Sequence, residues 1–350
     1  MSNTDKKMAT IIDVAKLSGV SVGTVSNVLN GTAKVSHTTQ QKVHEAIEAL
    51  NFRPNDMARS LRFTKTRLVG FLAPDINEFY NSVAKHFVEY AYQSGYTVLY
   101  SGCGYSKERE RDLIDLLLQK RAEVIVVIGG NFDEEYLCDL NDKGTKLLLL
   151  DRHIDNSGIP SVEFDNASTV RNLVGLLKMS GHKKIGFFSE TICMTNLEDR
   201  YRGYVRGIAD IRARLNSDYI FISDSLQMNK KTNAYLAMKH LLKTRTLEEL
   251  PDVFIVTSDY VAVGMMDAIH ECGLRIPEDI GITGFDNSVI CEYLSPPLTT
   301  IEQDVQKMGE IGWSVAQKMI NGSLKTDKRI LLAQKLIVRG TTKIKNSIAI

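Results

Sequence analysis

The sequence predicts a small all-α domain followed by a larger α/β domain built as two similar lobes. Apolar residues recur at helical spacing in three short segments near the N-terminus, and from Leu68 onward short apolar runs alternate with longer amphipathic segments. Charge divides the chain in the same way. Residues 1–67 hold ten Lys/Arg against five Asp/Glu, or +5, while the remaining 33 Lys/Arg and 37 Asp/Glu give −4. A basic module on a mildly acidic body suggests that the module alone meets a polyanion.

Composition excludes several classes of protein. The 350 residues are 43% hydrophobic and 24% charged, which is ordinary for a globular chain with room for two or three domains. No apolar run reaches the roughly 18 residues of a membrane span, and the N-terminus lacks the apolar stretch of a secretory signal. The five cysteines are scattered without a C-x-x-C pair. We therefore expect a cytoplasmic protein with free thiols and with no metal, cofactor or membrane partner.

Three short helices are expected between residues 10 and 51. Thr10, Ser21 and Ser36 are the expected N-caps, and Gly19 makes a tight turn between the first two helices. Each helix should turn an apolar stripe inward, namely Ile11, Val14, Ala15 and Leu17; Val22, Val25, Val28 and Leu29; and Val43, Ala46, Ile47 and Leu50. Two helices joined by such a turn are the helix-turn-helix unit, whose second helix enters the major groove of DNA.

The second of these helices carries side chains suited to DNA. Short hydroxyls that fit phosphate oxygens or helix caps are carried by Ser21, Thr24 and Ser26. Asn27 can make two hydrogen bonds to adenine, Val22 can pack on a thymine methyl, and Gly23 offers no side chain. The local pattern leaves open that these are solvent-facing polar residues of a small bundle.

The segments "ATIIDVAKLSGVSVGTVSNVLNG" and "VSHTTQQKVHEAIEALNFRPNDMARSLR" resemble the headpiece of the lactose/galactose/purine repressor family, almost without a break from Ala9 to Arg62. The resemblance implies that residues 8–54 form a sequence-specific DNA-binding headpiece, with Thr10 among its DNA-binding residues. It implies that the recognition helix is anchored on phosphates by Ser21, Thr24, Ser26 and Asn30. The variable base-reading positions would be Val22, Gly23 and Asn27.

Residues 55–67 are expected to form a hinge. Pro54 restricts Arg53 to extended conformations and so ends the headpiece. The segment "DMARSL" is too short to hold a helix in water, so we expect it to be disordered off DNA and helical on it. The resemblance implies that paired hinge helices lie in the minor groove, where the leucine wedges between bases, the alanine allows close approach and the arginines face phosphates. These residues are Ala58, Arg59, Leu61 and Arg62. A flexible linker with a solvated leucine is the alternative.

Residues 68–344 are expected to form the two α/β lobes. Apolar strands are predicted at 68–73, 96–101, 123–128 and 146–151, and again at 184–189, 219–223, 253–258 and 280–286. The predicted helices are 78–94, 107–120, 133–143, 166–180, 200–214, 232–244, 260–272 and 305–320. Continuous apolar strands with helical crossovers form parallel sheets covered on both faces, so two Rossmann-like lobes are expected. A small molecule would bind between them, beyond the carboxyl ends of the strands.

The family resemblance continues here through "SGHKKIGFFS", "RYRGYVRGI", "TSDYVAVGMMDAIHECGLRIPEDIGITGFDN" and "SPPLTTIEQDVQKMG", and these segments are also similar to periplasmic sugar-binding proteins. It implies chain crossings between the lobes near residues 165, 301 and 332. Lobe 1 would then be about 68–164 and 302–331, and lobe 2 about 165–301 and 332–344. It also implies a homodimer on a pseudo-palindromic operator, most simply a repressor, whose affinity a small-molecule effector controls as inducer or corepressor. The tail after Arg339 has no leucine heptads, so a dimer is expected rather than a tetramer.

The resemblance implies an effector site made of Asp75, Phe79, Tyr80, Arg200, Ser258 and Asp286. Asp286 matches the acidic residue that takes the ligand's hydroxyls, and Arg200 matches an arginine that reaches into the cleft. Phe79 and Tyr80 match an aromatic pair that stacks on a flat face. Ser258 replaces a more usual asparagine, and its shorter side chain weakens the expectation of a direct contact.

Two further positions favour a sugar or sugar derivative as the effector. A purine-binding arginine of the family falls near Met194, and its aromatic partner falls near Ser225, so the purine-binding pair is missing.

The sequence argues against two other classes of protein and leaves a third open. An enzyme would need catalytic residues, but no G-x-S-x-G, P-loop, G-x-G-x-x-G or HExxH motif occurs. Acids such as Asp151 and Asp259 at strand ends are common in any α/β fold. A sugar-binding protein without a DNA role would lack the headpiece. A regulator controlled by a protein corepressor, such as a phosphocarrier, stays open, although the helix at 78–94 offers few basic residues besides Lys85.

Overall fold

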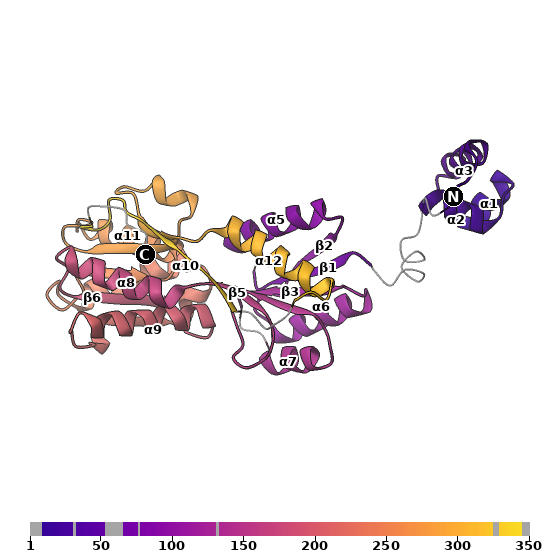
Figure 1. Ribbon diagram of the computed structural model, residues 1–350. Coiled ribbons are helices and arrows are strands. Elements are labelled where there is room, and N and C mark those ends of the chain that lie inside the picture. The colour runs from indigo at the N-terminus through magenta and orange to yellow at the C-terminus, as the bar shows by residue number, and fades with distance from the viewer. Residues whose placement is uncertain are drawn as a thin grey trace. The chain divides into compact units, whose positions relative to one another are not determined.

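A computed structural model describes residues 9–30, 33–52, 66–75, 78–130, 133–324 and 329–344. The chain divides into two compact units, Met1–Thr66 and Arg67–Ile350 (Figure 1). The predicted hinge residues Ala58, Arg59, Leu61 and Arg62 lie outside the described ranges. None of the helices within those ranges is long and apolar enough to cross a membrane.

The first unit holds the three predicted helices, α1 (Ile11–Ser18), α2 (Val22–Asn30) and α3 (His37–Ala49). The predicted caps are confirmed. The Ser21 hydroxyl accepts a hydrogen bond from the backbone N–H of Thr24 (3.1 Å), and the Ser36 hydroxyl accepts one from Thr39 (3.3 Å). Thr10 precedes α1 and donates through its backbone N–H to the Asp13 carboxylate (2.8 Å). Gly19 ends α1 with a φ of 69°, the left-handed conformation that a tight turn after a helix requires.

The headpiece core is small, and the predicted stripes supply most of it. Its buried members are Val14, Ala15, Val25, Val43, Ala46 and Phe52. Leu17 and Val22 were predicted to face the core, and this was wrong. The Leu17 side chain is 56% exposed and that of Val22 is 38% exposed. The buried face of α1 contains Val14, Ala15 and Ser18, and Leu17 lies about a third of a turn from that face. Val22 opens the first turn of α2 and faces solvent, which leaves it available for another surface.

The second unit contains two six-stranded sheets. The first holds β1 (Leu68–Ala73), β2 (Thr97–Gly102), β3 (Val124–Ile128), β4 (Leu147–Leu150), β5 (Ser161–Phe164) and β11 (Arg329–Leu332), all parallel, in the order β11-β5-β4-β3-β1-β2. Helices α5 (Glu78–Gln93) and α12 (Val305–Ile320) pack on one face, and α6 (Lys107–Gln119) and α7 (Glu134–Asp142) pack on the other. Alternate strand residues such as Phe71 and Leu72 enter opposite cores, so both faces are apolar.

The second sheet repeats this plan. It holds β6 (Ile185–Glu190), β7 (Ile220–Ser223), β8 (Val253–Val256), β9 (Gly281–Asp286), β10 (Thr299–Glu302) and β12 (Lys335–Ile337), in the order β12-β10-β9-β8-β6-β7, with only β12 antiparallel to its neighbour. Helices α8 (Asn166–Met179) and α9 (Thr195–Asp210) cover one face, and α10 (Lys230–Thr244) and α11 (Asp259–Glu271) cover the other. The last two pack closely through Gly264, since a Cβ there would lie 2.1 Å from the carbonyl oxygen of Lys231.

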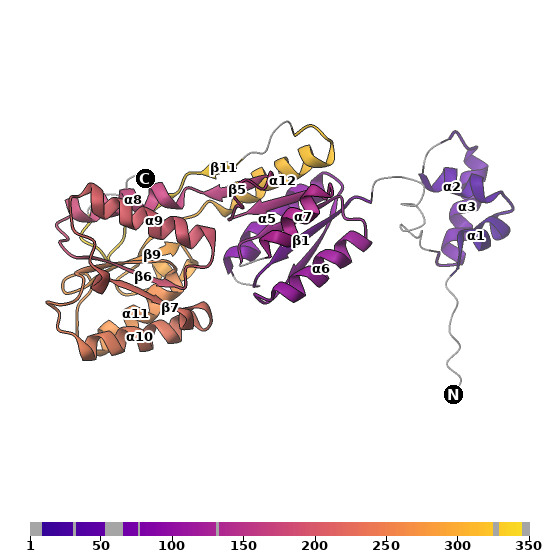
Figure 2. The same ribbon diagram turned by 90° about the horizontal axis from the view of Figure 1, so that it is seen from below.

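The chain passes between the sheets three times, between β5 and α8, between β10 and α12, and between β11 and β12. Each lobe is therefore assembled from separate stretches of sequence. In Figures 1 and 2 the late helix α12, in yellow, lies beside α5 of the first lobe. Strands β5, β10 and β11 were absent from the sequence prediction, and α9 begins at Thr195 rather than near Arg200.

Candidate functional site

The first turn of α2 forms an exposed edge of the headpiece. Ser21, Val22 and Gly23 are exposed, whereas Val25 in the next turn is fully buried. Thr24, Ser26 and Asn27 are half-buried, and Asn30 is the last residue of the helix. The Ser21 and Thr24 hydroxyls lie 2.9 Å apart, so both serve the helix cap. The N-terminus of a helix carries partial positive charge from unpaired N–H groups, which suits a phosphate.

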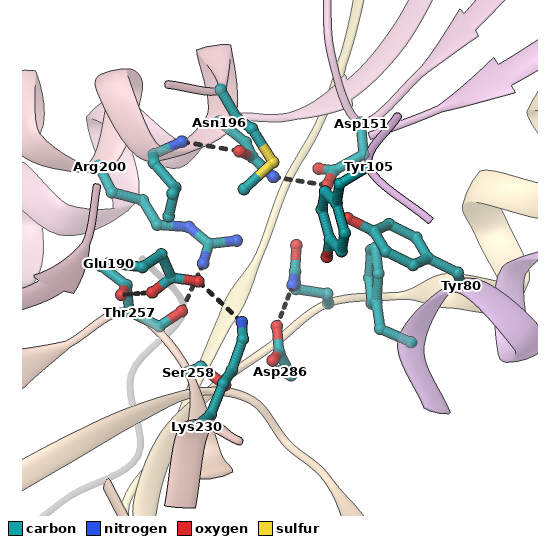
Figure 3. Close-up of a pocket in the computed structure, with 14 residues that line it drawn as sticks. Tyr80, Tyr105, Asp151, Glu190, Asn196, Arg200, Lys230, Thr257, Ser258 and Asp286 are labelled. Carbon is teal, nitrogen blue, oxygen red and sulfur yellow. Dashed lines mark hydrogen bonds and ion pairs between the residues drawn. The ribbon is translucent and has the colours of Figure 1, made fainter. Parts of the chain in front are cut away.

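The second site lies at the carboxyl ends of the strands in both sheets. The order of strands reverses between β1 and β3 in one sheet and between β6 and β8 in the other, and ligands of open α/β sheets bind at such points. A pocket enclosing about 450 Å³, part of it open to solvent, lies there. Its walls are Phe79, Tyr80, Tyr105 and Asp151 from lobe 1, Glu190, Met194, Asn196, Leu197, Arg200, Lys230, Thr257, Ser258 and Asp286 from lobe 2, and Gln303 from the segment between the lobes. Figure 3 shows side chains of the two lobes facing each other.

Asp286 ends β9 on the pocket floor. Its backbone has a φ of 114°, a conformation that side-chain-bearing residues rarely adopt. The Gln303 amide donates a hydrogen bond to its carboxylate (2.6 Å). Burial, and then the neighbouring Asp259 carboxylate, raise the pKa of Asp286 to about 8. A ligand hydroxyl that donates a hydrogen bond to Asp286 would therefore stabilise its ionised form, which burial disfavours in the free site.

Arg200 is buried in the middle of α9 and is held from three sides. Its guanidinium donates to the Asn166 side-chain oxygen (3.0 Å) and to the carbonyl of Thr257 (2.7 Å). It also lies over the Phe285 ring, 3.6 Å from the ring centroid. These contacts fix the guanidinium in the pocket wall, where its remaining N–H groups can reach a ligand.

Glu190 and Lys230 form an ion pair on the same side of the pocket, with 2.7 Å between Oε1 and Nζ. The Thr257 hydroxyl donates to the other carboxylate oxygen (2.7 Å). Burial alone would raise the pKa of Glu190, but Lys230 and these hydrogen bonds hold it below its ordinary value. The pair therefore carries no net charge.

Asp151 follows β4 and faces the pocket from lobe 1. The Asn196 amide of lobe 2 donates to its Oδ2 (2.7 Å), a hydrogen bond that joins the two lobes across the pocket (Figure 3). Its Oδ1 is buried and has no hydrogen-bond partner within the described ranges. Burial raises the pKa of Asp151 to about 7, although the Arg200 charge opposes the rise. An unsatisfied buried oxygen of this kind is costly until a donor arrives.

Aromatic rings complete the lobe 1 wall. Tyr80 packs edge to face on Phe79, with 5.5 Å between ring centroids. The Tyr80 ring fits because residue 129 is glycine, where a Cβ would lie 2.5 Å from the Tyr80 hydroxyl and the backbone φ is 56°. Burial raises the pKa of Tyr80 well above its ordinary value, so its phenol stays protonated. Tyr105 lines the same wall and is more exposed.

The structure brings five of the six predicted effector residues to this pocket, namely Phe79, Tyr80, Arg200, Ser258 and Asp286. The sixth, Asp75, follows β1 but is not among the residues that line the pocket. Sequence reasoning missed Asp151, Glu190, Asn196, Lys230 and Gln303 as lining residues. A signal existed for Asp151 and Glu190, because each stands at the end of a predicted strand.

A buried cluster away from the pocket brings together potential metal ligands. Single ligand atoms of His153, Glu163 and Asp199 lie within 4.8 Å of one another. Arg329 already pairs with both carboxylates at 3.1 Å. His153 donates to or accepts from Glu163 at 2.7 Å, and this hydrogen bond raises its pKa. The guanidinium therefore already balances the charge of two carboxylates that a metal cation would need as ligands.

Known proteins share both parts of the chain. Residues 10–55 match the model for bacterial regulatory proteins of the lacI family, and residues 174–342 match a periplasmic binding protein-like domain. The transcriptional repressor PurR of Vibrio vulnificus is 33% identical, with 96% of this chain and 99% of that protein covered. Catabolite control protein A of Priestia megaterium is 31% identical, with 95% of this chain and 99% of that protein covered. A crystal structure of the Lac repressor dimer, bound to operator and an anti-inducer, is 25% identical in sequence. The match covers 96% of this chain and 99% of that chain, with a TM-score of 0.84.

A helix-turn-helix headpiece joined to a two-lobed binding domain defines a DNA-binding transcriptional regulator rather than an enzyme. The chain belongs to the lacI family of bacterial regulatory proteins, and its function is that of a transcriptional repressor.

Proposed function

We propose that this repressor binds a pseudo-palindromic operator as a homodimer in the cytoplasm, and that a sugar or sugar derivative in the pocket between its lobes controls operator affinity. Residues 8–54 form the DNA-binding headpiece, 55–67 the hinge, and 68–344 the effector-binding and dimerisation domain. The observation that carries the proposal is the pocket itself, which collects polar side chains from both lobes at the carboxyl ends of both sheets.

The exposed first turn of α2 supports base reading by the headpiece. Val22 and Gly23 are open to a partner, and Asn27 follows one turn later on the same helix. Thr10, Ser21, Thr24, Ser26 and Asn30 contact phosphates in this proposal. Leu61, with Ala58, enters the minor groove, and Arg59 and Arg62 face the backbone. One headpiece contacts little DNA, so two copies related by a two-fold axis are needed for tight binding.

Dimerisation has separate support. The Lac repressor relative is described as a dimer on its operator. In this chain α5 leaves the large apolar side chains of Val88 and Tyr92 exposed, 37% and 75% respectively. Exposed apolar surface of this kind suits a second copy of the chain.

The chemistry of the pocket favours a hydroxyl-rich, uncharged ligand. Asp151 and Asp286 offer acceptor oxygens from opposite lobes, and Tyr80 offers a ring face. Lys230 is paired with Glu190, whereas Arg200 is held by neutral acceptors on Asn166 and Thr257. A phosphate would therefore meet one unpaired cation, Arg200, whose charge already acts on the carboxyl groups of Asp151 and Asp286. Met194 lines the pocket near the position where the family resemblance places a purine-binding arginine, and its presence favours a sugar over a purine.

Coupling to DNA follows from linkage. A ligand that contacts Asp151 and Asp286 at once holds the lobes in one relative position, and this changes the spacing of the two hinges in the dimer. Effector and operator then shift each other's affinity by the same factor. An inducer favours the lobe position that separates the hinges, and a corepressor favours the one that lets them pair.

The test uses the purified full-length chain in a selection from random double-stranded oligonucleotides, with and without a panel of mono- and disaccharides. We expect enrichment of a two-fold symmetric sequence, and at least one sugar should change its affinity. In Asp286→Asn, operator binding should persist while the sugar response is lost. In Leu61→Ala, operator affinity and bending should fall. A folded chain that enriches no sequence under any condition contradicts the proposal.

A further inference from the structure

The effector pocket continues into a second chamber of similar size. This chamber, here called the outer chamber, takes in about 450 Å³, part of it open to solvent, and is lined by Tyr105, Glu190, Cys193, Met194, Gln227 and Lys230. Four of these residues, Tyr105, Glu190, Met194 and Lys230, also line the pocket described above, the inner chamber. The two spaces therefore share a wall and are neighbours within one binding region.

The chambers differ in their lining. Asp151, Arg200 and Asp286 line the inner chamber alone, and the exposed Gln227 lines only the outer chamber. Cys193 and Gln227 line the outer chamber alone, so a ligand confined to the inner chamber leaves both untouched.

Hydrogen bonds already shape the outer wall in the free protein. The Gln227 amide donates to the Cys193 sulfur (3.4 Å), and the Thr191 hydroxyl donates to the Asp224 carboxylate. The Asn233 amide donates to the carbonyls of Ser225 and Met228 (2.6 and 2.8 Å), which braces the turn that carries Gln227. A braced wall keeps the chamber open without a ligand, which lowers the ordering cost of binding.

The outer chamber has the chemistry of an uncharged ring site. Among the described residues that line it, the charged ones are Glu190 and Lys230, which neutralise each other at 2.7 Å. The thiol of Cys193 and the thioether of Met194 give apolar surface, and burial raises the pKa of that thiol, so it stays neutral. Tyr105 offers a ring face, and Gln227 offers both an amide donor and an acceptor. A sugar ring needs this mixture of flat apolar contact and neutral hydrogen bonding.

We propose that the effector has two linked units, with one sugar ring held by Asp151, Arg200 and Asp286 in the inner chamber and a second ring in the outer chamber against Tyr105, Cys193 and Gln227. The effector is thus a disaccharide or a glycoside with a ring-sized second unit. This inference rests on the proposed function, because it takes the inner chamber to be the effector site.

The experiment compares matched sugars by calorimetry on the full-length protein. The probes are glucose and galactose against maltose, cellobiose and lactose, which contain those same rings. Two substitutions narrow the outer chamber, Cys193→Phe at its wall and Gln227→Trp at its exposed rim. Met228→Trp is the matched control, because Met228 is the exposed neighbour of Gln227 and lines neither chamber. Melting temperature and ligand-free operator binding confirm that each variant is folded.

We expect one disaccharide to bind more tightly than either of its component monosaccharides. Its Kd should rise about tenfold or more in Cys193→Phe and Gln227→Trp, because the added rings clash with the second unit. The Met228→Trp value should stay within about twofold of the unmodified chain. Any monosaccharide binding should be insensitive to all three substitutions.

Two results overturn the inference, and they differ in what else they affect. If a monosaccharide binds as tightly as every disaccharide containing it, or if both narrowing variants bind the disaccharide normally, the two-chamber ligand is wrong while the sugar effector stands. If no sugar binds at all, the proposed sugar effector fails together with this inference.

Discussion

Replacing Asp151 with asparagine is expected to stabilise the free protein in mildly alkaline solution and to weaken effector binding. The change keeps the shape of the side chain and an oxygen that can accept the Asn196 hydrogen bond. It removes a buried carboxyl group whose Oδ1 lacks a partner in the part of the chain that the structure describes.

The size of the effect follows from the pKa of Asp151, which burial raises from 3.8 to about 7. The folded chain then holds this proton more tightly than the unfolded chain, so the free energy of unfolding falls as pH rises from 3.8 through 7. At about 1.4 kcal/mol per pKa unit, the raised pKa lowers the free energy of unfolding by about 4 kcal/mol at pH 8, where the folded chain holds Asp151 ionised. At pH 5, where the folded chain holds Asp151 protonated, the loss is about 2 kcal/mol. Asparagine carries no such dependence. The advantage of Asp151→Asn should therefore grow by about 2–3 kcal/mol between these pH values.

The assay is urea unfolding at pH 5 and pH 8, followed by tryptophan fluorescence. Trp313 is the only tryptophan in the chain, and it is buried in the core of lobe 1, whose sheet also carries Asp151. Comparing the two chains at each pH cancels the titration of all other groups that do not contact Asp151. Parallel stability curves for Asp151→Asn and the unmodified chain from pH 5 to pH 8 would refute the reasoning.

Three further predictions test other parts of the molecule. Gly264→Ala should lower the melting temperature, by the equivalent of about 1–3 kcal/mol, because its Cβ would meet the Lys231 carbonyl oxygen at 2.1 Å. Gly175→Ala is the control, since nothing lies within 4 Å of its Cβ in helix α8, and it should leave the protein equally or more stable by circular dichroism. Asn27→Ala should cost about 1–3 kcal/mol of discrimination at one base pair in competition binding, and a uniform loss over all sequences would count against base reading. Affinity for a neutral sugar should rise from pH 6 to pH 9 as Asp151 and Asp286 ionise around their raised pKa values of about 7 and 8, and a calorimetric affinity that falls over this range would contradict their role as acceptors.

The sequence predicted the architecture well where burial is simple. Strands such as β3 (Val124–Ile128) and β4 (Leu147–Leu150) are buried throughout and read as unbroken apolar runs. Strand β5 escaped prediction because it buries Ser161 and Glu163 among its four residues. Glu163 is tolerated there because Arg329, 166 residues later, pairs with it. No local pattern reveals a partner at that distance.

The start of α9 was placed too late for a related reason. Its N-cap is Met194, which makes no capping hydrogen bond through its side chain, so the usual signal for a helix start is missing. Arg200 consequently lies in the middle of a helix, although its role in the cleft was expected from the family pattern.

The pocket was only partly predictable. Asp286 could be found because it ends a clear apolar strand, and Arg200 because of the family resemblance. The Glu190–Lys230 pair joins a strand end to a helix start 40 residues later, and the Asp151–Asn196 hydrogen bond joins two lobes. Such contacts depend on how the sheets come together, which spacing along the chain does not encode.

The interleaved path of the chain has a consequence for its synthesis. Helix α12 supplies Met308, Trp313, Val315 and Ala316 to the core of lobe 1, and β11 completes that sheet. A ribosome that has released the first half of this chain has therefore released a lobe with an uncovered apolar face, which must wait for residue 332 to emerge. The headpiece needs no such delay, since its core residues all lie between Val14 and Phe52. A nascent chain can thus carry a folded headpiece well before it carries a complete effector-binding domain. Premature termination or proteolysis near the C-terminus would damage both lobes at once.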